Sequence, residues 1–277
     1  MSGAHEKNTV SPSTTMGSLE CDAVEVALAR GPTLAQVTAT LRPGRFTAVL
    51  GPNGAGKSTL LSLLSGERVP RQGSVRLDGQ SLTHWAAQTL ALRRAVMPQD
   101  TAVAFDFTVR EVVELGRLPH RTSPSSREEA IVAGALAATG VGHLAQRGIS
   151  QLSGGERARV HLARALAQIW EPCPQGHARW LLLDEPTAAL DLAHQHQALG
   201  WVRRWAVEQN VGVVAVLHDL NLALRYAHDA LLLGHGCSQM GATADVLHRE
   251  SIARVWGVES SAVFASDGIV QYLFTKN

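Results

Sequence analysis

The residues best suited to chemistry form an octapeptide with the spacing G-x-x-x-x-G-K-[S/T]. Its glycines allow successive backbone N–H groups to turn toward phosphate oxygens, its lysine offers a point charge to the β- and γ-phosphates, and its serine hydroxyl suits Mg²⁺. The octapeptide and the residue after it are Gly51, Pro52, Asn53, Gly54, Ala55, Gly56, Lys57, Ser58 and Thr59. The pattern predicts a binding site for a nucleoside triphosphate, which we take to be ATP, together with Mg²⁺.

The segments on either side of this loop predict the elements that the motif requires. Phe46–Leu50 is a short apolar run typical of a buried strand, and the leucines of Ser58–Gly66 predict a helix. The N-terminus of that helix would add its positive dipole end to the phosphate site. The lysines of the chain are Lys7, Lys57 and Lys276, so the one in the body of the domain lies where a phosphate needs it.

A second candidate group follows the apolar run Leu181–Leu183, where Asp184 and Glu185 are adjacent. In α/β sheets, ligands bind beyond the carboxyl ends of the strands. We expect Asp184 to hold Mg²⁺ and Glu185 to polarise the water that attacks the phosphate. An acidic pair after a strand is weak evidence by itself, but it becomes strong evidence beside the loop at Gly51.

The pentapeptide Leu152-Ser153-Gly154-Gly155-Glu156 resembles the signature of the ATP-binding cassette (ABC) family, and the resemblance extends over nearly all residues from about 22 to 270. Ser153, with Glu156 three residues later, also predicts a capping box that opens a helix. In the family, Ser153, Gly154 and Gly155 would contact the γ-phosphate of ATP bound to the opposite subunit. The resemblance therefore implies a homodimer in the ATP-bound state.

Three further elements match the family residue by residue. Gln99 matches the glutamine that reaches Mg²⁺ and water, Asp191 belongs to the loop that crosses the dimer interface, and His218 matches the histidine that touches the γ-phosphate. The resemblance thus implies two overlapping sets of residues. They are Glu185, His218 and Gln99 for catalysis, and Ser58, Gln99 and Asp184 for the metal.

One departure from the family concerns the nucleotide base. The family usually places an aromatic residue near the first strand to stack on adenine, but no Phe, Tyr or Trp precedes Phe46. We expect adenine to rest on the Arg30 guanidinium or on aliphatic side chains instead. Selectivity for ATP over GTP is therefore in question, whereas hydrolysis is not.

The pattern of apolar residues predicts an α/β fold of the P-loop NTPase, ABC type: a RecA-like core plus an antiparallel β edge, with an inserted helical subdomain. We expect a disordered tail over residues 1–20 and a single ABC ATP-binding domain over 21–275, with the helical subdomain at about 100–165. The predicted strands outside the loop are an edge strand at Val24–Leu28, then Leu34–Leu41, Gly73–Gly79, Trp180–Leu183, Val211–Leu217 and an edge strand at Tyr272–Phe274.

Composition excludes several classes of function. The net charge of +1 over 277 residues gives no electrostatic case for nucleic acid. Cys21, Cys173 and Cys237 have neither metal-site spacing nor even parity, and His194 and His196 would lie on different faces of a helix. No segment approaches the roughly 18 apolar residues of a membrane span, and the polar N-terminus is no secretory signal.

Architecture separates the classes within the ABC family. One phosphate loop and one signature disfavour two-cassette translation factors, and the lack of a heptad run disfavours coiled-coil repair proteins. Exporters commonly fuse the cassette to membrane helices, and the sequence predicts none. Phe107–His120 and His218–Ala223 resemble the ATPases that serve iron-siderophore, haem and cobalamin permeases. The resemblance implies a peripheral subunit on an integral-membrane permease dimer, at the cytoplasmic face of the bacterial inner membrane. A regulatory ATPase without a transport role is the competing class.

An additional segment before the acidic pair narrows the cargo. Trp170–His177, with two prolines and a glycine, predicts a surface loop that most cassettes lack. This insertion resembles the ATPase subunits of haem (hemin) importers, as do Trp85, Arg93–Val96 and Asp191–His196. The hypothesis is haem uptake, with a periplasmic haem-binding protein as an indirect partner and ferric siderophore or cobalamin as alternatives. The dipeptide Cys173-Pro174 is too common to indicate a haem ligand.

Overall fold

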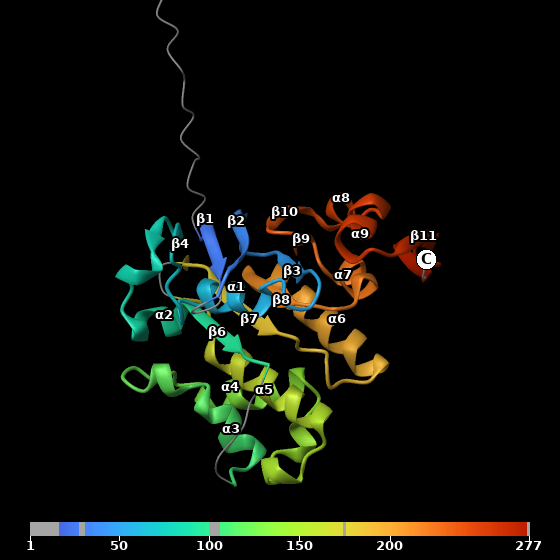
Figure 1. Cartoon of the computed structure of the whole chain (residues 1–277). Helices are drawn as coiled ribbons and strands as arrows, with labels where there is room; N and C mark the ends of the chain where they lie inside the picture. The colour runs from blue at the N-terminus through green and yellow to red at the C-terminus, as the bar shows by residue number, and fades with distance from the viewer. Residues whose placement is uncertain (1–16, 28–30, 100–105, 174–175, 276–277) are drawn as a thin grey trace, which may run out of the picture.

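The computed structural model describes residues 17–27, 31–99, 106–173 and 176–275 (Figure 1). Arg30, Pro174 and most of the predicted N-terminal tail lie outside these ranges. No helix of the described part of the chain is long and apolar enough to cross a membrane.

A six-stranded sheet with the order β10-β9-β3-β8-β7-β6 forms the centre of the molecule. Neighbouring strands from β9 to β6 run parallel, and β10 is antiparallel to β9. Strands β3, β7 and β8 are buried along their whole length, as expected for parallel strands covered on both faces. The strands are β3 (Phe46–Leu50), β6 (Arg94–Met97), β7 (Arg179–Asp184), β8 (Val211–Val216), β9 (Asp229–Gly234) and β10 (Cys237–Ala242).

A second, antiparallel sheet has the order β2-β1-β4-β5 and corresponds to the predicted β edge. β1 lies between β2 and β4, but its residues Val24–Ala27 pair with β2 alone, because β4 pairs only with Leu19–Asp22. The predicted edge strand at Val24–Leu28 is thus the second half of β1, and Leu28 lies outside the described residues. The alternation of apolar and polar residues in β1 reflects the burial of one face of the strand, and it does not depend on how many strands pair with β1. The strands are β1 (Leu19–Ala27), β2 (Thr33–Leu41), β4 (Ser74–Leu77) and β5 (Gln80–Ser81).

The helices cover the two faces of the central sheet. Alternate residues of β7 illustrate the division: Leu182 packs with α1 and the antiparallel sheet, whereas Leu181 and Leu183 pack with the core on the other face. The α-helices are α1 (Lys57–Leu64), α2 (Ala87–Arg93), α3 (Val109–Leu115), α4 (Glu128–Ala138), α5 (Gly154–Gln168), α6 (Leu192–Gln209), α7 (Leu220–Tyr226), α8 (Thr243–Val246) and α9 (Arg249–Trp256). The 3₁₀ turns that lie wholly within the described residues are Leu82–His84, Leu118–His120, Gly142–Leu144 and Ile149–Gln151.

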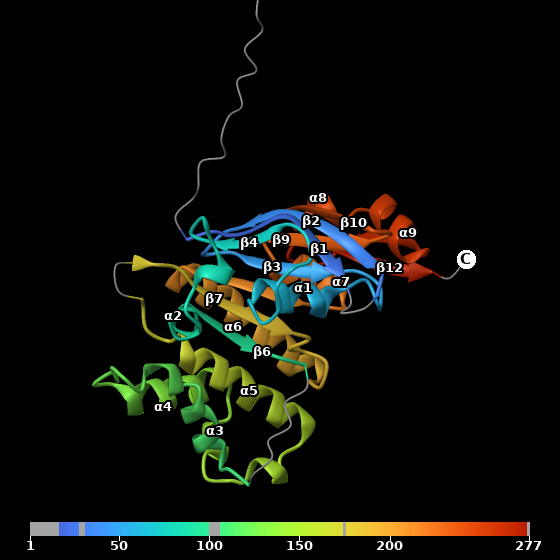
Figure 2. The ribbon, with the colours of Figure 1, turned by 60° about the vertical axis from the view of Figure 1, so that its left-hand side comes forward.

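Helices α3, α4 and α5 pack on one another and lie on the side of the molecule away from β1 and β2 (Figure 2). Their shared core includes Val112, Ile131 and Val160, each at most 1% exposed. The expected α/β fold with an inserted helical subdomain is therefore confirmed. The exact bounds of the domain stay a prediction.

The C-terminal part of the chain contains elements that the sequence patterns did not assign. The run Leu231-Leu232-Leu233 in β9 is as apolar as that in β7 and could have been recognised in the same way. The predicted strand at Tyr272–Phe274 exists, and it pairs in a separate hairpin of β11 (Glu259–Phe264) and β12 (Val270–Thr275).

The insertion at Trp170–His177 is anchored where the sequence predicted only a surface loop. Trp170 is half-buried, with its ring 6.4 Å from that of Trp201 and 6.4 Å from that of Trp205. A Cβ on Gly134 of α4 would lie 2.7 Å from the Trp170 ring, so the two segments are in close contact. The predicted surface loop therefore begins at a partly buried aromatic residue that packs on the core.

Candidate nucleotide-binding site

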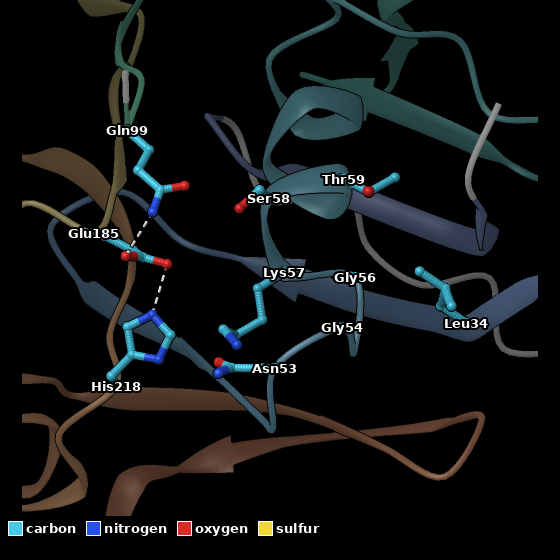
Figure 3. Close-up of a pocket in the computed structure, with 10 residues that line it drawn as sticks. All are labelled: Leu34, Asn53, Gly54, Gly56, Lys57, Ser58, Thr59, Gln99, Glu185 and His218. Atoms are coloured by element: carbon cyan, nitrogen blue, oxygen red, sulfur yellow. Dashed lines mark hydrogen bonds and ion pairs between the residues drawn. The ribbon is translucent and has the colours of Figure 1, made fainter. Parts of the chain in front are cut away.

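The carboxyl ends of four parallel strands bring the predicted site residues together. β3 leads into the phosphate loop, β6 leads to Gln99, β7 ends at Asp184, and β8 leads to His218. These ends surround a cavity of about 590 Å³, drawn in Figure 3. The residues that line it are Leu34, Asn53, Gly54, Gly56, Lys57, Ser58, Thr59, Gln99, Glu185 and His218. Gly51, Pro52, Ala55 and Asp184 adjoin these residues in the sequence without lining the cavity.

The phosphate loop holds Lys57 at the cavity. Its Nζ donates to the carbonyl oxygens of Gly51 at 2.9 Å and Pro52 at 3.0 Å. Burial lowers the pKa of Lys57, while the carboxylates of Glu185 and Asp184 oppose that shift. Gly56 precedes α1 with φ 94°, and a Cβ there would lie 2.7 Å from Val26, so this position requires glycine. The loop thus presents a cation and a helix N-terminus to the same space.

Ser58 and Asp184 form the candidate metal-binding pair. The Ser58 hydroxyl donates to Asp184 Oδ1 at 3.1 Å. Burial raises the pKa of Asp184, and the hydrogen bond from Ser58 works against that rise. A hydroxyl and a carboxylate are the oxygen ligands that Mg²⁺ accepts, together with waters and substrate phosphates. A divalent cation would also offset the cost of burying this carboxylate, so the residues fit Mg²⁺.

Glu185 is held between the two other predicted catalytic side chains. Gln99 Nε2 donates to Glu185 Oε2 at 2.9 Å, and His218 Nε2 lies 2.6 Å from Glu185 Oε1. Figure 3 shows both side chains pointing at the carboxylate from opposite sides. The backbone of Glu185 has φ 50°, a left-handed conformation that costs a non-glycine residue about 1–2 kcal/mol. Such strain is concentrated at functional sites.

Leu34 is the lining residue that sequence reasoning did not single out. It belongs to β2 and lies across the cavity from His218 (Figure 3). The described lining residues include no Phe, Tyr or Trp, and Arg30, one expected support for adenine, lies outside the described residues. Leu34 is thus the aliphatic side chain best placed to contact a base. Leu34 lies beside the phosphate loop, since a Cβ on Gly56 would be 3.2 Å from Leu34 Cδ1, and this contact between distant segments is not evident from the sequence.

The signature residues lie apart from this cavity. Ser153 caps α5 in the predicted capping box: its hydroxyl accepts from the Glu156 N–H at 3.3 Å, and Glu156 Oε2 accepts from the Ser153 N–H at 2.8 Å. Ser153 and Gly154 are exposed. A Cβ on Gly155 would lie 2.9 Å from the Ala189 carbonyl oxygen, so the signature packs directly against the loop that leads to Asp191.

Asp191 begins α6 as an exposed N-cap. Its Oδ1 accepts from the His194 N–H at 2.9 Å, and this backbone hydrogen bond lowers the pKa of Asp191. His194 Nδ1 also lies 2.8 Å from this carboxylate, whereas His196 Nδ1 lies 2.7 Å from the Tyr226 hydroxyl. The two histidines therefore have separate partners, in keeping with their predicted placement on different helix faces.

Sequence comparison identifies relatives along most of the chain. A family model described as ABC transporter matches residues 34–188, which is more than half of the chain. A protein from Myxococcus xanthus named hemin import ATP-binding protein HmuV is 50% identical over 248 residues, covering 89% of this chain and 92% of the relative. A protein of the same name from Pseudomonas entomophila is 51% identical over 227 residues, covering 82% of this chain and 87% of the relative.

Structural comparison finds the same fold. A chain from a transporter assigned to the metal-chelate type of ABC transporter, in an inward-facing conformation, aligns with a TM-score of 0.78 and 28% identity, covering 94% of this chain and 98% of that one. A dimeric ATP-binding cassette bound to ADP and Pi aligns with a TM-score of 0.70 and 25% identity, covering 81% and 98%. With the phosphate loop, the acidic pair and the signature in place, the chain belongs to the ABC transporter family as an ATP-binding subunit.

Proposed function

We propose that this chain is the ATPase subunit of a binding-protein-dependent importer and hydrolyses ATP to drive haem uptake through a separate permease. One observation carries the enzymatic part: the Glu185 carboxylate lies between Gln99 and His218 at the mouth of the phosphate loop. A carboxylate so placed can take a proton from water at the end of a bound triphosphate.

The residues around the cavity have different roles in binding and hydrolysing ATP. Lys57 and the loop N–H groups bind the β- and γ-phosphates, and His218 orients the γ-phosphate beside Glu185. Ser58, Asp184 and Gln99 would hold Mg²⁺, which supplies charge to neutralise the phosphate oxygens. Glu185 positions the attacking water and accepts its proton. Leu34 provides an apolar contact for the base.

The proposed assembly is a homodimer in the ATP-bound state. Within one chain, the exposed Ser153 and Gly154 lie outside the cavity that contains Lys57, so a second copy is needed to bring a signature onto the nucleotide. The dimeric cassette bound to ADP and Pi supports this arrangement. The dimer would dock on a permease dimer at the cytoplasmic face of the inner membrane, with a periplasmic haem-binding protein as an indirect partner and no role for nucleic acid.

The cargo is proposed from the relatives. Proteins about half identical to this chain, and similar to it along more than four-fifths of their own length, are named for hemin import. Ferric siderophore is the second candidate, because the metal-chelate type of transporter shares the fold over nearly the whole chain. The cassette subunit itself has no need to contact the cargo, since the permease and its binding protein select it.

A growth experiment separates these candidates. The gene is deleted, and the strain receives the native gene, the Glu185→Gln variant or Glu208→Gln, an exposed control on α6. With haem as the sole iron source, we expect growth with the native and control genes and none with Glu185→Gln. Normal growth of the deletion strain on haem, with lost growth on a ferric siderophore, would move the cargo to siderophores and leave the ATPase role intact.

A further inference from the structure

The helix that follows His218 is too short to be stable without support. α7 has seven residues, about two turns, and isolated helices of this length are marginal in water. Asp219 caps its first turn, accepting from the N–H groups of Asn221 at 2.7 Å and Leu222 at 3.0 Å. The residue before this cap is His218, so any movement of the start of α7 also moves the backbone of His218.

The side chain of Asn221 connects the start of α7 to the C-terminal hairpin. Its Nδ2 donates to the Tyr272 carbonyl oxygen at 3.1 Å, and its Oδ1 accepts from the Tyr272 N–H at 2.7 Å. The amide therefore behaves like one peptide unit of an additional strand along β12. Because both its donor and its acceptor are used, this contact fixes direction as well as distance. We call this pair of hydrogen bonds the Asn221–Tyr272 clamp.

The strand that receives the clamp is itself fixed. Tyr272 is 6% exposed and belongs to the large hydrophobic core. Its hydroxyl donates to the Leu247 carbonyl oxygen at 3.2 Å, which ties β12 to the segment between α8 and α9. The clamp therefore connects the first turn of α7 to a rigid part of the fold and not to a loose end of the chain.

The opposite end of α7 has a weaker tie to the same hairpin. Arg225 Nη1 lies 2.5 Å from Asp267 Oδ2, and both side chains are partly exposed. An exposed ion pair of this kind contributes little to stability. It lies a full turn further from His218 than Asn221 does. α7 thus contacts the hairpin at two points, one close to the candidate catalytic histidine and one remote from it, and the remote contact can serve as a control.

We infer that Asn221 is a positioning residue for His218, and that the C-terminal hairpin sets the geometry of the hydrolytic site through the Asn221–Tyr272 clamp. The inference rests on the proposed role of His218 in hydrolysis. His218 contacts Glu185 at 2.6 Å with 46% of its side chain exposed, so its own surroundings restrain it little. A displacement of about 1 Å in a catalytic group is enough to lower turnover substantially.

The test uses the full chain with the substitution Asn221→Ala. Alanine keeps the backbone N–H that Asp219 accepts and has a higher helix propensity than asparagine, so α7 itself is not weakened. We expect kcat for ATP hydrolysis to fall about tenfold, while KM for ATP stays within about twofold. Arg225→Ala, which removes the remote tie, should leave kcat within about twofold. Urea unfolding checks that each variant is folded.

A double-mutant comparison with His218→Ala makes the test specific. If Asn221 acts through His218, Asn221→Ala should lower single-turnover hydrolysis in the native background and have no further effect in the His218→Ala background. An equal loss in both backgrounds, or a native rate for Asn221→Ala beside an inactive His218→Ala, would overturn the inference and leave the proposed function standing. A native rate for His218→Ala would instead remove His218 from the proposed mechanism, and the inference with it.

A second substitution of Asn221 keeps the inference testable if Asn221→Ala does not fold. Asn221→Asp has nearly the same size and keeps the acceptor for the Tyr272 N–H, but places a carboxylate against the Tyr272 carbonyl oxygen. We expect a loss of kcat at least as large as that of Asn221→Ala, since half of the clamp becomes repulsive. A native kcat in this variant would contradict the clamp even if Asn221→Ala could not be purified.

Discussion

The phosphate-loop end and the signature end of the candidate site differ in how much of a ligand site one chain builds. At the first, Lys57, Glu185 and His218 converge from separate strands on a single cavity. At the second, Ser153 is occupied with its own capping box, and its side chain is open to solvent. The comparison teaches that a helix cap can supply hydrogen-bond donors for an anion but does not form a closed pocket around it. We propose that a second copy of the chain completes the pocket.

The largest expected effect belongs to the phosphate-loop end. Glu185→Gln keeps the size of the side chain and a partner for Gln99, but removes the charge that polarises water. We expect kcat to fall by at least about 100-fold with ATP affinity retained, because general-base catalysis contributes roughly 10²–10⁴-fold. Single-turnover hydrolysis and nucleotide titration measure the two quantities. Glu208→Gln is the matched control, and a native kcat for Glu185→Gln would exclude this carboxylate as the base.

A substitution at the signature end should separate folding from activity. Ser153→Arg places a bulky cation where the partner's phosphate would lie, so we expect about a 100-fold loss of hydrolysis, similar to losing a key transition-state donor. The monomer should stay folded but lose about 1 kcal/mol in urea unfolding, because arginine cannot replace the Ser153 N-cap of α5. Ser123→Arg, also exposed in the helical subdomain, is the control. Unimpaired hydrolysis by Ser153→Arg would contradict a role for the signature.

The helix behind the signature should respond to pH independently of either site. His161 of α5 is 2% exposed, and burial lowers its pKa from the usual 6.5 to about 4. Neither ring nitrogen has a hydrogen-bond partner among the described residues. The folded state therefore favours the neutral ring, whereas the unfolded chain binds a proton once the pH falls below 6.5. Stability is fully present above pH 6.5 and declines as the pH approaches 4.

The size of this effect follows from the same shift in pKa. At pH 5, His161 should lower the free energy of unfolding by about 2 kcal/mol relative to pH 7. Urea unfolding at the two pH values measures it. His161→Leu should remove most of the difference, whereas His143→Leu, at an exposed position, should not. An unchanged pH dependence in His161→Leu would show that another group is responsible.

The smallest expected effect concerns the base. Leu34→Ala removes part of the apolar surface beside the phosphate loop, so we expect nucleotide affinity to fall by about 1 kcal/mol, or about fivefold. The affinities for ATP and GTP should fall by the same factor, because an aliphatic side chain makes no hydrogen bonds that could distinguish the two bases. Titrations with both nucleotides give the answer, with Leu273→Ala on the exposed hairpin as the control. A change in kcat without a change in affinity would remove Leu34 from the base site.

The sequence predicted where the candidate site residues would come together, because their motifs are local. Gly51–Ser58 and Asp184-Glu185 each follow a buried apolar run, and parallel strands bring their carboxyl ends to one edge of the sheet. Ser153 and Glu156 also predicted their capping box from spacing alone. In each case the interaction lies within a few residues, or follows from a general rule of sheet topology.

The remaining features depend on contacts between distant segments. Asn221 and Tyr272 are 51 residues apart, and nothing in either segment identifies the other. The pairing of Leu19–Asp22 in β1 with Ser74–Leu77 in β4 was likewise not predicted, because the two segments are far apart in the sequence. The packing of Trp170 on α6 was missed because the prolines of its segment indicate a loop while saying nothing about burial.

The most direct test of the central claim mixes two inactive chains. Lys57→Ala lacks a working phosphate loop, and Ser153→Arg lacks a working signature. In a mixed dimer, one nucleotide site would carry both defects, while the other would combine the intact phosphate loop of one chain with the intact signature of the other. We predict that equal amounts of the two chains recover up to about a quarter of native ATP hydrolysis, since about half of the dimers are mixed and each has one intact site. Hydrolysis no greater than the sum of the separate variants would contradict a site shared between two copies.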